Sequence, residues 1–184
     1  MTSKKSSDPT WSDVKAKRLD FDRAGMLRLV RDLYSASKDN QNFLHARFEL
    51  GNDVLEPYKA IIERWAWPDI DRNQDYSVAK AKKPIGDYRK AIGRPEGLAE
   101  LAVFYCEQAI GFSNEVGLDD GGYYDAFCGM FEQALNTVMA LAEAERQPLV
   151  DRLEEVRLSG QGIGWGVEDD LNALWQGAGL KADE

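Results

Sequence analysis

His45 is the only histidine among the 184 residues, and its side chain has the clearest capacity for acid–base chemistry near neutral pH. If its segment is helical, Asn42, His45 and Glu49 share one face at spacings of i, i+3 and i+7, with Arg47 at the edge. A histidine with a carboxylate four residues later could orient a general base. The same groups could instead hydrogen-bond neighbouring helix ends. We favour the structural role and keep these four residues as a candidate binding face.

The two cysteines, Cys106 and Cys128, are expected to be inert. Both fall on apolar stripes of expected helices, where a thiol keeps its proton and is a poor nucleophile. No secretory signal precedes them, so we expect reduced, buried thiols instead of a disulfide. Two cysteines and one histidine are also too few for a zinc site of the Cys/His kind. The sequence therefore predicts no catalytic residue, no metal site and no cofactor.

A cluster of positive charge lies in a single expected helix near the middle of the chain. With Tyr76 and Tyr88 nearby, it could form a small surface for nucleic acid or phosphate. A solvated basic face, or one paired with acidic groups of the same chain, is the favoured interpretation. The patch consists of Lys80, Lys82, Lys83, Arg89, Lys90 and Arg94.

The charge of the chain is distributed unevenly along its length. The net charge is −9; residues 1–95 hold 19 Lys/Arg and 14 Asp/Glu, giving +5, and residues 96–184 hold 4 and 18, giving −14. A strongly acidic half repels nucleic acid, so a nucleic-acid partner is not expected there. That half could suit a basic protein partner or could simply keep the protein soluble.

Four glycines alternate with other residues over 160–166, in the order Gly-Gln-Gly-Ile-Gly-Trp-Gly. The spacing does not match a dinucleotide-binding fingerprint, and a phosphate-binding loop would need a lysine followed by serine or threonine. The alternation of Ile163 with Trp165 favours an extended segment that docks Trp165 onto the helices.

Helical periodicity dominates the rest of the chain. Asp22 can cap the first main helix, with Phe21 and Met26 at the spacing of a hydrophobic staple. Pro84 should kink or divide the fourth helix, and Pro148 should begin the seventh. The expected helices cover about 22–34, 37–48, 53–67, 77–92, 95–117, 119–145 and 148–158, with a short last one ending near 175.

Seven or eight helices joined by short loops predict an all-α fold, because neighbouring helices on short turns pack antiparallel. We expect a compact multi-helix bundle or a short superhelix of antiparallel helical hairpins. Residues 1–20 should form a flexible arm with Trp11 as a docking point, 21–176 a single helical domain, and 177–184 a frayed tail. No apolar run is long enough to cross a membrane, and no signal segment is recognisable, so a cytoplasmic location is expected.

Two stretches resemble an uncharacterised bacterial family. They read LYSASKDNQNFLHARF from Leu33 and KAKKPIGDYRKAIGRPEGLAEL from Lys80, and the resemblance covers roughly 27–141. This domain-of-unknown-function family carries a similar first run, a lysine-rich helix and a Pro-Glu-Gly-Leu helix start. The resemblance implies a helical bacterial protein and brings no activity or catalytic residue with it.

The favoured function is a non-enzymatic protein–protein interaction or regulatory module with an unidentified protein partner. It rests on the helical architecture and the charge asymmetry. Two alternatives stay open: an enzyme that uses His45 with a carboxylate in a helical cleft, and a nucleic-acid-associated protein that uses the basic helix at 80–94. A pocket around His45 would favour the first alternative, and a continuous basic surface the second.

Overall fold

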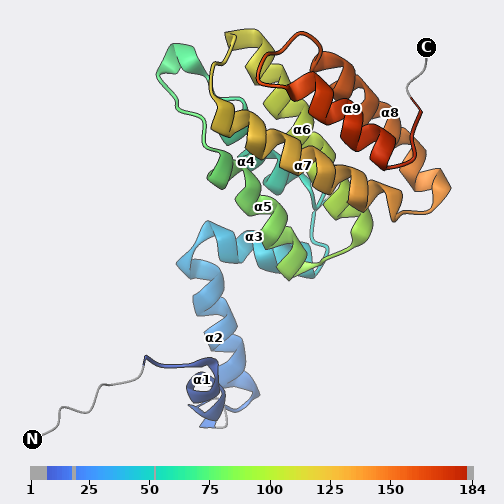
Figure 1. Cartoon of the computed structure of the whole chain (residues 1–184). Coiled ribbons are helices and arrows are strands. Elements are labelled where there is room, and N and C mark those ends of the chain that lie inside the picture. Colours follow the sequence, from blue (N-terminus) through green and yellow to red (C-terminus); the bar gives the residue numbers. More distant parts are fainter. Residues whose placement is uncertain (1–7, 18–19, 52, 182–184) are drawn as a thin grey trace, which may run out of the picture. The chain divides into compact units, whose positions relative to one another are not determined.

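Helices account for the regular structure of the chain, as the periodicity predicts. The computed structural model describes residues 8–17, 20–51 and 53–181, and within these ranges the fold is all-α, without strands (Figure 1). The elements are α1 (Trp11–Lys17), α2 (Arg23–Ala36), α3 (Lys38–Arg47), α4 (Glu56–Ala66), a 3-10 turn η2 (Ile70–Arg72), α5 (Val78–Ala91), α6 (Pro95–Val116), α7 (Gly121–Met139), α8 (Glu143–Ser159) and α9 (Val167–Gly177).

Polar caps and special backbone residues set most helix ends, as the sequence predicts. The side chains of Asp22, Ser77 and Asp120 each accept a hydrogen bond from the backbone N–H three residues later, at the starts of α2, α5 and α7. Pro95 occupies the first turn of α6, where its missing N–H costs nothing. Gly117 ends α6 with φ of 62°, a left-handed conformation that glycine adopts without a steric penalty.

The prolines interrupt the helices less than predicted. Pro84 lies inside α5, which runs through it as one helix, so the expected division does not occur. Pro148 lies inside α8, which begins five residues earlier at Glu143. The carbonyl of Ala142 already accepts the first helical bond, from Arg146, and the acidic first turn suits the positive end of the helix dipole. The preceding helix is correspondingly shorter than predicted and ends at Met139.

The chain divides into two units by its contacts, residues 1–44 and 45–184. The first unit contains α1, α2 and most of α3. The short α1 lies within the predicted arm. The remaining residues predicted for the arm, 1–7 and 18–19, lie outside the described part of the chain.

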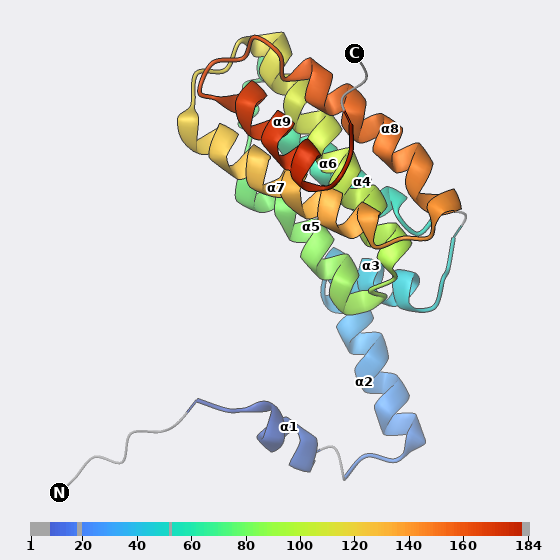
Figure 2. The same ribbon diagram turned by 45° about the vertical axis from the view of Figure 1, so that its right-hand side comes forward.

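The second unit is an all-α bundle built around α6, which packs against α4, α5, α7 and α8. In Figure 2, α9 lies against α7 and α8, and both contacts are close. The apolar faces of α6 and α7 form much of the core, because most of their members are almost inaccessible to solvent. These include Leu101, Tyr105, Phe112, Tyr124, Phe127, Phe131, Leu135 and Val138.

The segment that follows α9 is attached to the bundle. Beyond α9, the indole N–H of Trp175 donates to the carbonyl of Lys181 at 3.1 Å, which ties the start of the predicted tail to the bundle. Residues 182–184 of that tail lie outside the described part. Among the described residues, no helix is both long enough and apolar enough to span a bilayer.

Candidate functional site

The predicted polar face around His45 is largely occupied with structural contacts. The guanidinium of Arg47 donates to the carbonyl of Ala91 at 3.2 Å, the last residue of α5. Glu49, which has a left-handed φ of 54°, pairs its carboxylate with Arg94 just before α6. Arg47 and Glu49 therefore connect the end of α3 to the turn between α5 and α6, in the way that the structural interpretation expects.

Asn42 and His45 are both partly buried on α3, and they fall on opposite sides of the division between the two units. Two large apolar side chains of this segment do not anchor it. Phe43 and Phe48 are exposed, Phe48 at 65%, and the buried residue of α3 is Ala46. None of the four predicted site residues lines the surface hollow described below. Their role in binding stays a prediction.

Most side chains of the predicted basic patch make separate contacts with other groups of the same chain. The ammonium of Lys80 lies 3.9 Å from the ring centre of Trp65. Lys82 donates to the carbonyl of Ala126 in α7 at 2.9 Å, and burial lowers the pKa of its ammonium group. Of the other members, Lys83 pairs with Asp87, Arg94 pairs with Glu49, and Arg89 and Lys90 are exposed. Most of this charge is thus engaged within the chain.

Both cysteines are free thiols, as predicted, but only Cys106 is fully buried. Burial is the main cause that raises the pKa of the Cys106 thiol far above its ordinary value. Cys128 is half-buried on α7, and desolvation, with smaller effects of Asp170 and Asp125, raises the pKa of its thiol to about 11. Cys128 is therefore less buried than expected, because its side of α7 is not fully covered.

We expect the two thiols to react at very different rates. At pH 8, a pKa of about 11 leaves roughly a thousandth of Cys128 as thiolate, the reactive form. Ellman's reagent should therefore label Cys128 slowly in the folded protein and Cys106 only after unfolding. Cys128→Ser should abolish the slow phase, and Cys106→Ala should leave it. Rapid labelling of two thiols under native conditions would contradict this assignment.

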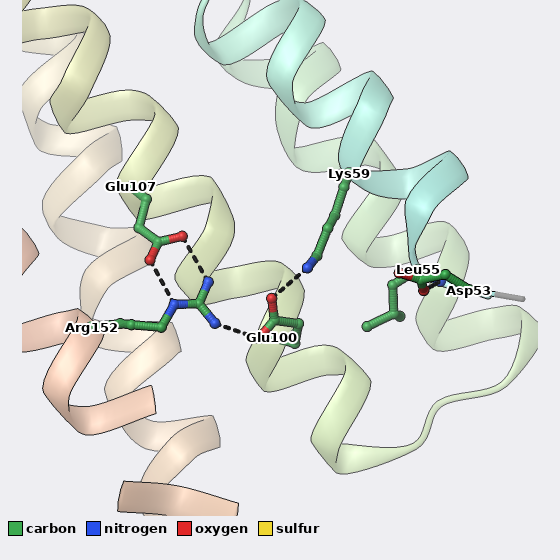
Figure 3. Close-up of polar contacts among 6 residues, drawn as sticks. All are labelled: Asp53, Leu55, Lys59, Glu100, Glu107 and Arg152. Carbon is green, nitrogen blue, oxygen red and sulfur yellow. Dashed lines mark hydrogen bonds and ion pairs between the residues drawn. The ribbon is translucent and has the colours of Figure 1, made fainter. Parts of the chain in front are cut away.

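A network of four charged side chains joins α4, α6 and α8 (Figure 3). Arg152 of α8 makes two parallel bonds to the carboxylate of Glu107, both of 2.7 Å, and a third of 2.6 Å to Glu100. Glu100 also accepts a bond of 2.6 Å from the ammonium of Lys59 in α4. Two cations and two anions thus alternate, so the network is neutral overall.

Partial burial strengthens this network. Burial alone would raise the pKa of Glu100, but hydrogen bonds from Arg152 and Lys59 outweigh it and hold the pKa below its ordinary value. The bonds to Glu107, followed by the bond to Glu100, raise the pKa of Arg152. Each side chain keeps a fifth to a third of its surface exposed, and its polar atoms face one another. The arrangement is that of a structural clamp.

Within the first unit, α2 carries an apolar stripe that the rest of that unit does not bury. Met26, Leu29, Val30 and Leu33 lie at spacings of i, i+3, i+4 and i+7, so they share one face of the helix. Leu33 is 51% exposed, and the only residue of α2 that is buried is Gly25, which packs under the ring of Phe21. An apolar helix face that no other element of its unit covers is a candidate contact surface for another protein.

The structure also corrects the prediction for Trp165, which was expected to be docked in the bundle. Its side chain is 62% exposed at the rim of a surface hollow in the second unit. Sequence alternation could not find this site, because residues 160–166 form turns in place of an extended segment.

Among the described residues, no cluster of three or more His, Cys, Asp or Glu side chains has the arrangement of a metal site. Comparisons with protein-family models, with curated proteins and with solved structures found no match.

Proposed function

We propose that this protein is a non-enzymatic interaction module of the cytoplasm that binds a partner protein through the apolar stripe of α2. The observation that carries the proposal is the exposure of Leu29, Val30 and Leu33 on one face of a helix that is capped by Asp22. Burying side chains of this kind contributes about 1.5–3 kcal/mol each. An exposed apolar face that would gain this much free energy on burial is best explained by a partner protein that covers it.

The partner that suits this stripe is a protein with an apolar groove and an acidic rim. Amphipathic helices enter such grooves with anchors at i, i+3, i+4 and i+7, which is the spacing of Met26 to Leu33. Arg28 and Arg31 lie on the opposite, polar side of α2 and would face the rim. Complementary charges at the edge would raise the association rate and fix the direction of the helix.

The two alternatives have less support. Most cations of the segment 80–94 are engaged with aromatic rings, carbonyls or carboxylates of the same chain, which weakens a nucleic-acid role. For an enzymatic role, the contacts of Arg47 and Glu49 with the turn between α5 and α6 already explain much of the face around His45. The resemblance to an uncharacterised bacterial family stays a prediction.

We expect a single charge on the stripe to weaken partner binding strongly. Leu33→Asp, in the full-length chain, should weaken binding about 100-fold, because a buried unpaired carboxylate replaces an apolar anchor. The melting temperature of the second unit should not change. To identify the partner, a photo-crosslinking amino acid can be placed at position 33 in host cells, with position 28 on the polar face as the matched control. Affinity for the identified partner can then be measured by titration calorimetry.

Three outcomes would count against the proposal. Crosslinking of position 33 to a second copy of the chain would assign the stripe to self-association. Equal crosslinking from positions 28 and 33 would show that the contact is not specific to the stripe. Full binding by Leu33→Asp would place the partner surface elsewhere.

A further inference from the structure

A hollow of about 390 Å³ lies on the surface of the second unit. Its walls come from four segments: the end of α6 with Ser113 and Asn114, the turn with Leu118 and Asp119, α7 with Tyr124, and the glycine-rich segment with Trp165. Its volume falls in the range of sites that hold small molecules. The glycine-rich segment has a conspicuous sequence pattern, and it is not part of the interaction surface proposed on α2.

Trp165 is held beside the hollow in an unfavourable backbone conformation. Its φ is 64°, a left-handed value that is rare for a bulky residue. The indole N–H donates to the carboxylate of Asp119 at 3.1 Å, and the ring lies so close to Gly121 that an added Cβ would stand 2.8 Å from it. The ring thus packs against the backbone of Gly121 while most of the side chain stays exposed to solvent.

This arrangement is difficult to explain by stability alone. A tryptophan that served the core would be buried, and an ordinary surface loop would not place its largest side chain at a strained position. The four glycines around it permit turns that orient the ring, since Gly162 and Gly166 both have φ of 74°. The loop therefore presents an aromatic face to the solvent beside a hollow.

The charges around the hollow select a positive ligand. Among the described lining residues there is no lysine, arginine or histidine, and Asp119 is the ionisable acid. Asp120 follows it and has a pKa below its ordinary value, chiefly because the hydroxyl of Tyr76 donates to it. Glu168 lies close by and accepts from the N–H of Gly162 at 3.1 Å. An anion would be repelled here.

We propose that the hollow beside Trp165 binds an organic ammonium group, with the exposed indole ring against the cation and Asp119 as its counter-ion. An ammonium group is attracted to the negative face of an aromatic ring, most strongly to tryptophan, and the carboxylate adds a direct charge interaction. The cation can come from a free amine or from a lysine side chain of a peptide. The two sources share this chemistry and differ in what surrounds the charge.

The test is a titration followed by NMR. The indole N–H signal of Trp165 in the full-length, ¹⁵N-labelled protein is assigned by its loss in Trp165→Phe. Choline and Nα-acetyl-lysine amide are the probes, and glucose and acetate are the neutral and anionic comparisons. We expect a saturable shift of this signal with an ammonium probe and none with glucose or acetate. A stronger response to choline assigns a small free ammonium compound, and a stronger response to the lysine derivative assigns a peptide.

Variants separate this site from general surface effects. Trp165→Ala should weaken binding, observed on the ligand signals, by about tenfold, and Asp119→Asn by about three- to tenfold. Trp67→Ala is the matched control, since the ring of Trp67 also lies against a glycine, Gly111, and donates to a carboxylate, Glu115, away from the hollow. Because both rings are partly exposed, we expect Trp165→Ala and Trp67→Ala to remain folded, which far-UV circular dichroism can check.

The proposal fails under any of three results. These are the absence of a saturable shift with either ammonium probe, a response to glucose or acetate as strong as to choline, and a loss of binding in Trp67→Ala as large as in Trp165→Ala. If Trp165→Ala does not fold, Asp119→Asn together with the probe series decides the question. Binding by Asp119→Asn that equals the native protein would then overturn the assignment of the counter-ion.

Discussion

Replacing Arg152 by alanine is expected to lower the free energy of unfolding by about 2–4 kcal/mol. The guanidinium makes three charge-assisted bonds, two to Glu107 and one to Glu100, and about 30% of its surface is exposed. Removing it leaves two partly buried carboxylates on α6 that face each other without their shared cation. Urea unfolding of the full-length protein, monitored by circular dichroism, measures the loss.

The rest of the network supplies the controls. Lys59→Ala should cost only about 1 kcal/mol or less, since Lys59 makes one bond at the edge of the network. Arg152→Lys should not restore stability, because a lysine cannot make the two parallel bonds to Glu107. A double-mutant cycle between Arg152 and Glu107 should give a coupling of about 1–3 kcal/mol. A loss below about 0.5 kcal/mol in Arg152→Ala would show that the clamp does not stabilise the bundle.

The same network gives the stability a defined dependence on pH. The pKa of Glu100 is lower in the folded protein than its ordinary value of 4.5. The unfolded state therefore binds the proton more readily, and stability falls as pH falls. The contribution of Glu100 is fully present above about pH 4.5 and is lost as pH drops through the lowered pKa. In Arg152→Ala, this part of the acid sensitivity should shrink.

Local signals were sufficient to predict most helices and much of the core. Asp22, Ser77 and Asp120 can be recognised as caps because each needs only the backbone three residues away. The apolar faces of α6 and α7 follow from the 3.6-residue period. Pro148 was misleading as a helix start, and Pro84 does not divide α5, since the packing of a long helix can compensate for one missing hydrogen bond.

The candidate sites could not be predicted in the same way. The partners in the charge network are 41 to 52 residues apart, and no local spacing brings Arg152 to Glu107 before the fold is known. The exposure of Trp165 depends on a left-handed backbone angle and on the bond to Asp119, 46 residues earlier. The 3.6-residue period of the stripe on α2 predicts a buried face, but within the first unit Leu29, Val30 and Leu33 are exposed, because periodicity alone does not show whether another element covers the face.

The first turn of α6 gives the other large effect that we expect. Gly97→Ala should destabilise the protein by about 2–3 kcal/mol, although alanine favours a helix over glycine. The backbone of Gly97 lies directly against the hydroxyl end of Tyr88, so an added Cβ would overlap that side chain. Tyr88 is buried and packs edge-on against Tyr58, with 5.4 Å between ring centres, so it has no free space to move into. Thermal and urea unfolding measure the loss.

Two other helical glycines separate this overlap from the general effect of a methyl group. At Gly129 of α7, an added Cβ would have no heavy atom of another part of the chain within 4 Å, so Gly129→Ala should stabilise the protein by about 0.5–1 kcal/mol. Gly111 lies against the ring of Trp67, which is partly exposed and can rotate outward, so Gly111→Ala should fall between the two. The order of stability should therefore be Gly129→Ala, Gly111→Ala and Gly97→Ala, from highest to lowest. If Gly97→Ala were as stable as the native protein, α6 would not approach α5 as closely as this contact requires.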